Sequence, residues 1–506
     1  MSGRILDASS EAMPAQIDCE VCVVGSGCGG ATAAWELAKA GKDVVVLEEG
    51  GDYVGPALTM RDGMYDQLYM ERGGRATDDL AISVMQGRVL GGGGVINASD
   101  VVPLHDGVLR CWVKKYGLSA FTPEAVEPYR RAALEDLMAN VPPSMNENNQ
   151  LAERGAKALG WRGEVMPHNR QGCIGLGKCM VGCRVSAKRN PRMVAIPAAI
   201  AAGARFFLRA RAVRVEGATS ETKTVRVRTL DAKGYHERGE AIVRAKTVIL
   251  AANAVASAEL LLKSGLGNEH VGRWLTLQPQ LPLTAVFEHE VRSFRGIPQS
   301  YAVTEFEDLE DAEHGWWGFR IEPIAVTPGI TASVLPKLGH LGKELMTRFP
   351  HLAASLLLVP DADNGRVTID RGRARISYAM PDEQKKRYRD AVKAGARMYL
   401  AAGAKEVIVP TSRAVVIRSE ADLAAVDAID FAPATAPFIS AHQQGTVRFA
   451  PSAKDGGADP AGQVWGTRGI YVLDSSGFPT SASSHTMTPI LTVARMLARQ
   501  LAAEVR

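Results

Sequence analysis

The sequence has few cysteines, seven in 506 residues, and their number is odd. A disulfide framework needs many paired cysteines, so this composition argues against one and favours reduced thiols. No apolar run reaches the roughly 18 residues that a membrane-spanning helix requires. Residues 1–16 have no apolar core like that of a secretory signal. These absences predict a cytoplasmic protein without a transmembrane segment.

An excess of charge of one sign is also missing. The formal net charge is only +4, and the sequence has no dense run of Lys and Arg. A nucleic-acid-binding protein needs a basic patch that neutralises phosphates. We therefore expect no nucleic-acid partner.

Glycine, in contrast, is abundant, with 50 residues gathered in a few runs. The first run follows an expected strand over residues 18–24 and precedes an expected helix over 31–40. A second strand is expected over 44–47. Strand, glycine turn, helix and strand in this order are typical of a dinucleotide-binding fold.

The residues of this unit suit a bound dinucleotide. Gly25, Gly27 and Gly30 allow the backbone to approach a pyrophosphate at the start of the helix, where N–H groups are free. Glu48 ends the second strand, where a carboxylate accepts hydrogen bonds from ribose hydroxyls. The alternative is a glycine turn that binds no ligand.

A second glycine-rich loop, Gln86–Asn97, distinguishes between NAD and FAD. Its four successive glycines, Gly91–Gly94, expose backbone on both sides, so a large group is expected to lie against them. Two separated glycine loops suit a long cofactor with a ring system at its far end. The pattern favours FAD.

These motifs resemble those of the glucose–methanol–choline (GMC) flavoprotein oxidoreductases. The first signature of that family runs Gly-Arg-x-x-Gly-Gly-Ser-Ser-x-x-Asn, and Gly87, Arg88, Gly91, Gly92 and Asn97 match it. The two serines of the signature are glycines in this sequence, which removes two hydroxyl groups near the flavin. The closest branches of the family, by these motifs, are the long-chain alcohol oxidases and the bacterial FAD-dependent glucose dehydrogenases.

Three further segments carry the resemblance. Residues 253–267 resemble the second signature, with Asn253 in place of its usual glycine. Val213 falls where the family has a residue beside the adenine, and Asp474 lies in the loop that covers the flavin ring. The resemblance implies FAD. We expect it to be bound non-covalently, because residues 97–100 offer no histidine for attachment, although His105 follows.

The chain is too long for one ordinary hydrophobic core, so two or three domains are expected. The resemblance implies an α/β protein with a Rossmann-like FAD-binding domain and an inserted α+β substrate domain that contains an antiparallel sheet. Residues 1–280, with a cysteine loop at 168–190, form the main part of the FAD-binding domain. Residues 281–410 form the substrate domain, and residues 411–506 return to the FAD-binding domain and carry the catalytic histidine.

Residue patterns predict the other main elements. The expected helices cover residues 123–139, 149–160, 255–264, 338–348, 384–401 and 489–504. The expected strands cover residues 205–216, 224–230, 245–252, 356–359 and 469–474.

Oxidation of an alcohol needs a base for the hydroxyl proton, and neutral imidazole serves near pH 7. By resemblance, His442 is this base and His485 is its partner, which holds the substrate oxygen. Another register of the family motif places Thr488 at the second position. Threonine does not take up a proton at neutral pH, so we favour His485. The alternative for His485 is a helix-start residue bonded to backbone.

The substrate is less well defined by the sequence. Apolar residues recur at helical spacing over 335–346, and residues 356–359 read as a buried strand. Either a lid over an apolar channel or an ordinary core has this pattern. The region has no obvious cluster of sugar-binding groups. We expect FAD-dependent oxidation of a lipophilic alcohol, a small molecule, to an aldehyde or ketone. A non-catalytic flavin-binding electron-transfer subunit is the alternative of another class.

Three of the cysteines, Cys173, Cys179 and Cys183, lie within eleven residues of a glycine-rich loop. By resemblance to the glucose dehydrogenase branch, this spacing holds a [3Fe-4S] cluster, which three thiolates can ligate. Buried structural thiols are an equally open reading, and zinc or a disulfide are others. A cluster would make the protein a sugar or polyol dehydrogenase that passes electrons to an acceptor protein.

Overall fold

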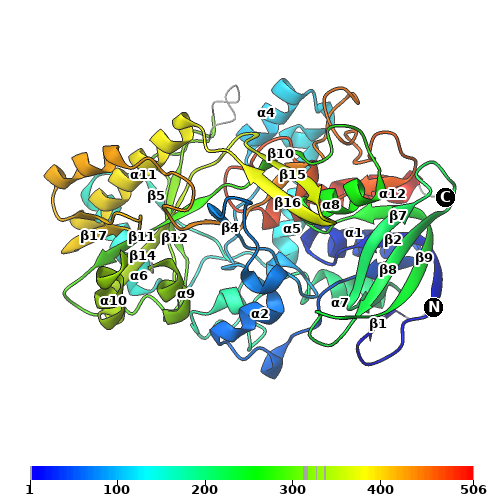
Figure 1. Cartoon of the computed structure of the whole chain (residues 1–506), viewed down its shortest axis with the longest axis horizontal. Coiled ribbons are helices and arrows are strands. Elements are labelled where there is room, and N and C mark those ends of the chain that lie inside the picture. The colour runs from blue at the N-terminus through cyan, green and yellow to red at the C-terminus, as the bar shows by residue number, and fades with distance from the viewer. Residues whose placement is uncertain (1–2, 311–316, 326, 336–337, 505–506) are drawn as a thin grey trace.

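Three β-sheets organise the part of the chain that this computed structural model describes, residues 3–310, 317–325, 327–335 and 338–504. Figure 1 shows two of them at opposite ends of the molecule, with β7, β8 and β9 in one body and β11, β14 and β17 in the other. Strands β10, β15 and β16 lie between the two bodies. No helix of the described residues combines the length and the apolar character needed to cross a bilayer.

The first sheet has eight strands in the order β1-β6-β3-β2-β9-β8-β7, with β21 beside β9. β2 pairs in parallel with β3 and β9, whereas β7, β8 and β9 are antiparallel. The last four residues of β2 and all of β3 are buried, as expected where helices cover both faces of a parallel sheet. The strands are β1 Arg4–Asp7, β2 Gln16–Val24, β3 Val44–Leu47, β6 Arg205–Leu208, β7 Ala210–Glu216, β8 Lys223–Leu230, β9 Glu237–Leu250 and β21 Ile470–Val472.

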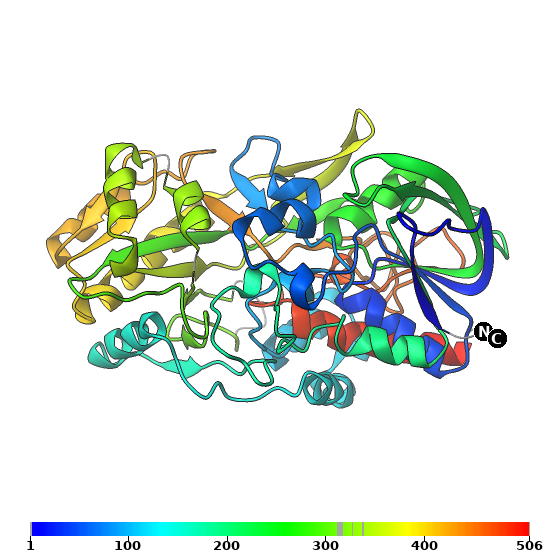
Figure 2. The same cartoon turned by 90° about the horizontal axis from the view of Figure 1, so that it is seen from below.

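Helix α1 (Cys28–Lys39) connects β2 to β3 and completes the predicted nucleotide-binding unit. Helix α12 (Met487–Glu504) packs along α1, so the last segment of the chain returns to the first (Figure 2). The Rossmann-like fold class is confirmed. The other helices are α2 Tyr65–Leu68, α3 Gly93–Ile96, α4 Asp106–Tyr116, α5 Pro123–Asp136, α6 Glu147–Ala158, α7 Ala195–Ala201, α8 Ala254–Ser264, α9 Pro328–Val334, α10 His340–Thr347 and α11 Asp382–Ala401.

The second sheet has nine strands and is mostly antiparallel, which confirms the predicted antiparallel sheet. Its main order is β18-β17-β11-β14-β13-β12-β5, and β19 joins β11 to β4. Helices α6 and α11 pack against it. The strands are β4 Ile82–Val84, β5 Gly163–Val165, β11 Gln280–Val286, β12 Tyr301–Val303, β13 Arg320–Pro323, β14 Leu352–Leu358, β17 Glu406–Val409, β18 Val415–Ile417 and β19 Phe438–Ser440.

A four-stranded sheet in the order β16-β15-β10-β20 links the two bodies. Strand β10 spans Arg273–Thr276, β15 Gly365–Asp370, β16 Arg373–Tyr378 and β20 Gln444–Thr446. Because the nine-stranded sheet also takes strands from outside residues 281–410, the domain boundaries at 280 and 410 stay a prediction.

One expected strand is wrong in its extent. Residues 205–216 do not form a single strand of a hairpin, because the backbone at Arg209 is left-handed, with φ +55°. This turn separates β6, which joins the parallel strands, from β7, which pairs antiparallel with β8. The apolar segment expected over 335–346 forms α10 in part, and its residues 336 and 337 lie outside the described residues.

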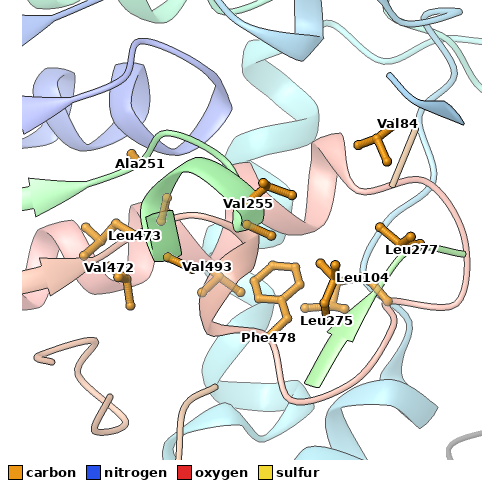
Figure 3. Packing of buried hydrophobic residues seen from close by; sticks show 14 of the residues in the cluster. Val84, Leu104, Ala251, Val255, Leu275, Leu277, Val472, Leu473, Phe478 and Val493 are labelled. Atoms are coloured by element: carbon orange, nitrogen blue, oxygen red, sulfur yellow. The ribbon is translucent and has the colours of Figure 1, made fainter. Parts of the chain in front are cut away.

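The buried core continues from the first sheet to the loops near the C-terminus. Figure 3 shows Val472 and Leu473 beside Ala251, and Phe478 close to Leu275. These side chains fix the loop that follows β21 against β10 and α8. The segments that carry the predicted C-terminal site residues are therefore anchored in the core.

Candidate active site

A single cavity of about 990 Å³ runs from the glycine turn after β2 to strands β11 and β14. Most of the predicted site residues lie on its wall, although they come from distant parts of the chain. The residues concerned are Gly25, Gly27, Glu48, Arg88, Gly92, Asn97, Val213, His442, Asp474 and His485. The structure therefore brings these residues together, while their individual roles stay predictions.

The two glycine loops touch through their backbones. A Cβ atom on Gly92 would lie 2.6 Å from the Cα of Gly27, and Gly92 has φ +58°. Only glycine fits there. Gly27 precedes the first residue of α1, and no side chain caps the helix. The N-terminal N–H groups of a twelve-residue helix thus face the cavity between two glycine backbones, which fits a pyrophosphate.

Gly30 and Gly91 are not among the residues that line the cavity, and their contact with a cofactor stays a prediction. A Cβ on Gly30 would lie 1.9 Å from the carbonyl oxygen of Gly25, so this glycine allows α1 to pack closely on β2. The backbone N–H of Gly91 donates to Ser26 Oγ at 3.1 Å and joins the two glycine loops. Both residues thus support the conformation of the glycine loops through contacts on the side away from the cavity.

The nucleotide end of the cavity contains Glu48 and Val213. Glu48 accepts hydrogen bonds from the Ser26 hydroxyl at 2.6 Å and from the Gly50 N–H at 2.7 Å. Burial raises the pKa of Glu48. Val213 lies at a register shift between β7 and β8, and this irregularity in the pairing places it on the cavity wall.

The side chain of Arg88 is hydrogen-bonded to backbone carbonyl groups. Its guanidinium donates to the carbonyl oxygens of Gly234 at 2.8 Å and Lys233 at 3.0 Å, in the turn between β8 and β9. The neighbouring Tyr235 ring lies under the guanidinium of Arg72, 4.0 Å from its carbon to the ring centre. Arg88 therefore holds this turn over the cavity.

At the other end of the predicted flavin site, Asp474 is buried and fully engaged. Its carboxylate accepts from the Asn253 N–H at 2.9 Å, the Ser257 hydroxyl at 2.7 Å and the Ser476 N–H at 2.8 Å. Burial raises its pKa. Asp474 thus fastens the start of α8 to the loop that follows β21. Asn97 lies on the same wall, and its side-chain oxygen accepts from the Ser99 N–H.

His442 and His485 lie next to each other. Their ring centres are 5.0 Å apart and their planes meet at 76°. His442 follows β19, and His485 lies just before α12. Thr488 is in the first turn of α12 and does not line the cavity. The structure places His485, and not Thr488, beside His442.

The two imidazoles differ in charge. Burial and, to a lesser extent, the adjacent His485 lower the pKa of His442 to about 3, although Glu322 opposes the shift. Burial also lowers the pKa of His485, but Glu322 outweighs this effect, and the net shift is upward. Glu322 Oε2 lies 2.8 Å from His485 Nε2. His442 is therefore neutral at pH 7, and His485 is the imidazole of the pair that takes up a proton more readily.

The sequence did not indicate Glu322. Its side chain is completely buried on β13, and its carboxylate lies 2.7 Å from the Arg320 guanidinium. Gln299 also donates to it. Burial raises the pKa of Glu322, but His485 and Arg320 together lower it to about 2. The available signal was two charged residues at alternate positions of one strand, Arg320 and Glu322.

Beyond the histidines the cavity wall becomes apolar. Pro282 on β11 and Ala354, Leu356 and Leu358 on β14 line it, together with Ile330 on α9. Residues 354, 356 and 358 share one face of β14 because side chains alternate along a strand. Their side chains offer no hydrogen-bonding group.

The cysteine loop at 168–190 contains the three thiols for which the sequence left a [3Fe-4S] cluster and structural thiols both open, and the cluster stays a prediction. All seven cysteines are free thiols, and no group of three or more His, Cys, Asp or Glu side chains in the described ranges is placed to hold a metal ion. Gly177 packs on the backbone of Phe294, where a Cβ would lie 2.2 Å from the carbonyl oxygen. Cys179 begins a short 3-10 helix.

Comparisons with known proteins agree with this geometry. Residues 65–280 and 360–494 match the two family models described as GMC oxidoreductase, and residues 23–79 match an NAD(P)-binding Rossmann-like domain. An uncharacterised GMC-type oxidoreductase of Mycobacterium tuberculosis is 32% identical over 99% of this chain and 78% of its own. A long-chain-alcohol oxidase of Arabidopsis thaliana is 27% identical over 96% of this chain and 67% of its own.

Solved structures share the fold. Pyridoxine 4-oxidase from Mesorbium loti superposes with a TM-score of 0.71 at 17% identity, over 95% of this chain and 99% of its own. Formate oxidase of Aspergillus oryzae RIB40 gives a TM-score of 0.69 at 15% identity, over 97% and 99% of the two chains.

Proposed function

Because the chain belongs to the GMC oxidoreductase family, we propose that it binds FAD non-covalently and oxidises the CH–OH group of a lipophilic alcohol. The observation that carries this proposal is the neutral His442 at the junction of a glycine-lined and an apolar part of one cavity. The similarity to long-chain-alcohol oxidases supports the same substrate class.

The cavity suits FAD at its glycine-lined end. The backbones of Gly27 and Gly92 would hold the pyrophosphate, Glu48 the ribose and Val213 the adenine. Bound flavin supplies the hydride acceptor. Non-covalent binding is supported by His105, which does not line the cavity: its Nδ1 accepts from the Gly107 N–H at 3.0 Å at the start of α4.

The two histidines have different roles toward the substrate hydroxyl group: one is the base and the other is a hydrogen-bond donor. Neutral His442 takes the hydroxyl proton, because a low pKa keeps its ring nitrogen unprotonated. His485, held as a cation by Glu322, donates a hydrogen bond to the substrate oxygen and stabilises negative charge on it. Glu322 is thus the residue that keeps the two imidazoles in different protonation states.

A lipophilic substrate suits the far wall of the cavity. Leu356 and Leu358 give no partner to a hydroxyl group, and a buried hydroxyl without a partner is costly. A sugar would leave several hydroxyls unpaired there. An alkyl chain, in contrast, gains free energy for each CH₂ group buried against this wall.

Purified FAD-bound protein, mixed anaerobically with 1-dodecanol, cholesterol or glucose, tests the proposal. We expect the flavin absorbance to bleach with dodecanol or cholesterol. Bleaching with glucose alone would overturn the lipophilic substrate, and no bleaching with any alcohol would favour an electron-transfer subunit. Admitting oxygen to the reduced protein then distinguishes oxygen from an acceptor protein as the final oxidant.

A further inference from the structure

A buried amide lies behind the proposed base. Gln278 lies between β10 and β11, and none of its surface is exposed. Its side-chain N–H donates to the carbonyl oxygen of Ser483 at 2.6 Å, and its amide oxygen lies against His442 Nδ1. An amide has one donor end and one acceptor end, so the bond to Ser483 fixes the oxygen as the end that faces the imidazole.

This arrangement selects one tautomer of His442. A neutral imidazole carries a single N–H, and with Gln278 accepting from Nδ1 the proton lies on that nitrogen. The amide nitrogen of Gln280, Nε2, also lies 3.1 Å from Nδ1. Two donors cannot face each other, so with the proton on Nδ1 the Gln280 amide is turned to present its oxygen, whereas the bond to Ser483 fixes the amide of Gln278. Nε2, which has no hydrogen-bond partner among the described residues, keeps its lone pair.

Asp361 holds Gln278 in place. Its buried carboxylate accepts from the backbone N–H groups of Leu277 at 2.7 Å and Gln278 at 2.9 Å, and from the Tyr378 hydroxyl at 2.9 Å. Gln278 has φ +42°, a conformation that non-glycine residues seldom adopt. The two bonds to the carboxylate keep the backbone there, and with it the direction of the side chain.

We propose that Gln278, held by Asp361, is a positioning residue that keeps the proton of His442 on Nδ1 and leaves Nε2 free for the substrate. The inference rests on the proposed function. The hydroxyl proton of the alcohol moves to Nε2, and the carbon-bound hydrogen leaves as hydride with its two electrons to the flavin. The resulting imidazolium keeps its Nδ1 proton on the Gln278 oxygen.

An amide suits this position better than a carboxylate. Both accept the Nδ1 proton, but a carboxylate stabilises the imidazolium and raises the pKa of the base. The neutral amide selects the tautomer without adding charge, so the base stays unprotonated at acidic pH. Glutamine therefore selects the Nδ1 tautomer of His442 and also leaves the pKa of the base low.

Gln278→Leu and Gln278→Glu separate these effects. Loss of the acceptor in Gln278→Leu is expected to slow anaerobic flavin reduction by dodecanol about 10²-fold, at unchanged FAD content, because the proton is no longer confined to Nδ1. Gln278→Glu restores an acceptor, and the acid limb of its pH profile is expected at higher pH than in the wild type. Gln463→Leu, which removes a half-buried amide outside the cavity, is the matched control.

The ¹⁵N shifts of the His442 ring report the tautomer without any substrate. We expect Nδ1 to be protonated in the wild type and the proton to be shared between both nitrogens in Gln278→Leu. The same tautomer in both proteins, or an unmoved acid limb in Gln278→Glu, would overturn the inference. If no alcohol bleaches the wild type, the proposed function fails, and the tautomer result still tests Gln278.

Discussion

The imidazole of His485 is nearly perpendicular to that of His442, and the carboxylate of Glu322 is hydrogen-bonded to His485 but not to His442. Two identical side chains 5.0 Å apart therefore have opposite pKa shifts. Pairs of groups whose surroundings separate their pKa values commonly divide acid and base roles. The following expectations depend on this asymmetry.

Removal of the base should leave the cofactor in place. In His442→Ala we expect normal FAD content and a rate of flavin reduction lower by about 10³-fold, within the range that general bases contribute. Stopped-flow absorbance under anaerobic conditions measures it. His340→Ala, on a helix of the second body, serves as the control. A wild-type rate in His442→Ala would show that another group takes the proton.

Loss of the charge on Glu322 should make the reaction sensitive to alkali. In Glu322→Gln the pKa of His485 is expected to fall, because burial lowers it and the opposing carboxylate is gone, so this imidazole loses its proton at lower pH than in the wild type. The flavin-reduction rate at high pH should then be lower by about 10²-fold, the usual cost of one oxyanion donor. Rates measured across the pH range in both proteins give the test. Parallel profiles would show that Glu322 is only structural.

The base itself should be insensitive to moderate acid. Because the pKa of His442 is about 3, it stays neutral well below the ordinary histidine value, and wild-type flavin reduction should show no acid limb near pH 6.5. An acid limb at that pH would mean that His442 is solvated in the working enzyme.

The free energy of unfolding should also depend on the protonation of His442, and the contribution of this residue should increase with pH. Between its folded pKa of about 3 and its unfolded pKa near 6.5, the unfolded chain binds more protons at His442, so stability rises with pH in this window. The lowered pKa of Glu322 acts in the same direction between about 2 and 4.5. The raised pKa values of buried carboxyl groups such as Asp361, Glu48 and Asp474 act in the opposite direction. His442 alone is expected to contribute about 2–4 kcal/mol to the difference in urea-unfolding stability between pH 7 and pH 4. His442→Gln should reduce this difference, and an unchanged slope would contradict the assignment.

The glycine contact between the two loops should be essential for the cofactor. In Gly92→Ala the new methyl group would collide with the backbone of Gly27 at a residue with positive φ. We expect a folded protein that purifies without FAD absorbance. Gly63→Ala is the control, because a Cβ there meets nothing within 4 Å. A yellow Gly92→Ala protein would show that the loops can separate without loss of binding.

The sequence indicated those parts of the site whose residues are neighbours along the chain. The β2–α1–β3 unit was visible because strand, glycine turn, helix and Glu48 follow one another within one segment. Glu322 and Gln278 were not visible, since each meets its histidine only through the pairing of distant strands, 163 and 164 residues away in sequence. The break at Arg209 was missed for a related reason: an arginine carries no mark of a left-handed backbone.

The apolar wall offers the sharpest test of the substrate class. In Leu356→Gln an amide replaces an aliphatic side chain on the cavity face of β14. Loss of about one to two CH₂-sized contacts, at about 0.8 kcal/mol each, should raise KM for dodecanol by roughly 10-fold while kcat stays within twofold. Ethanol, which is too short to reach the wall, should be unaffected in the same protein. An equal change for both alcohols would mean that Leu356 supports the fold and does not contact the substrate chain.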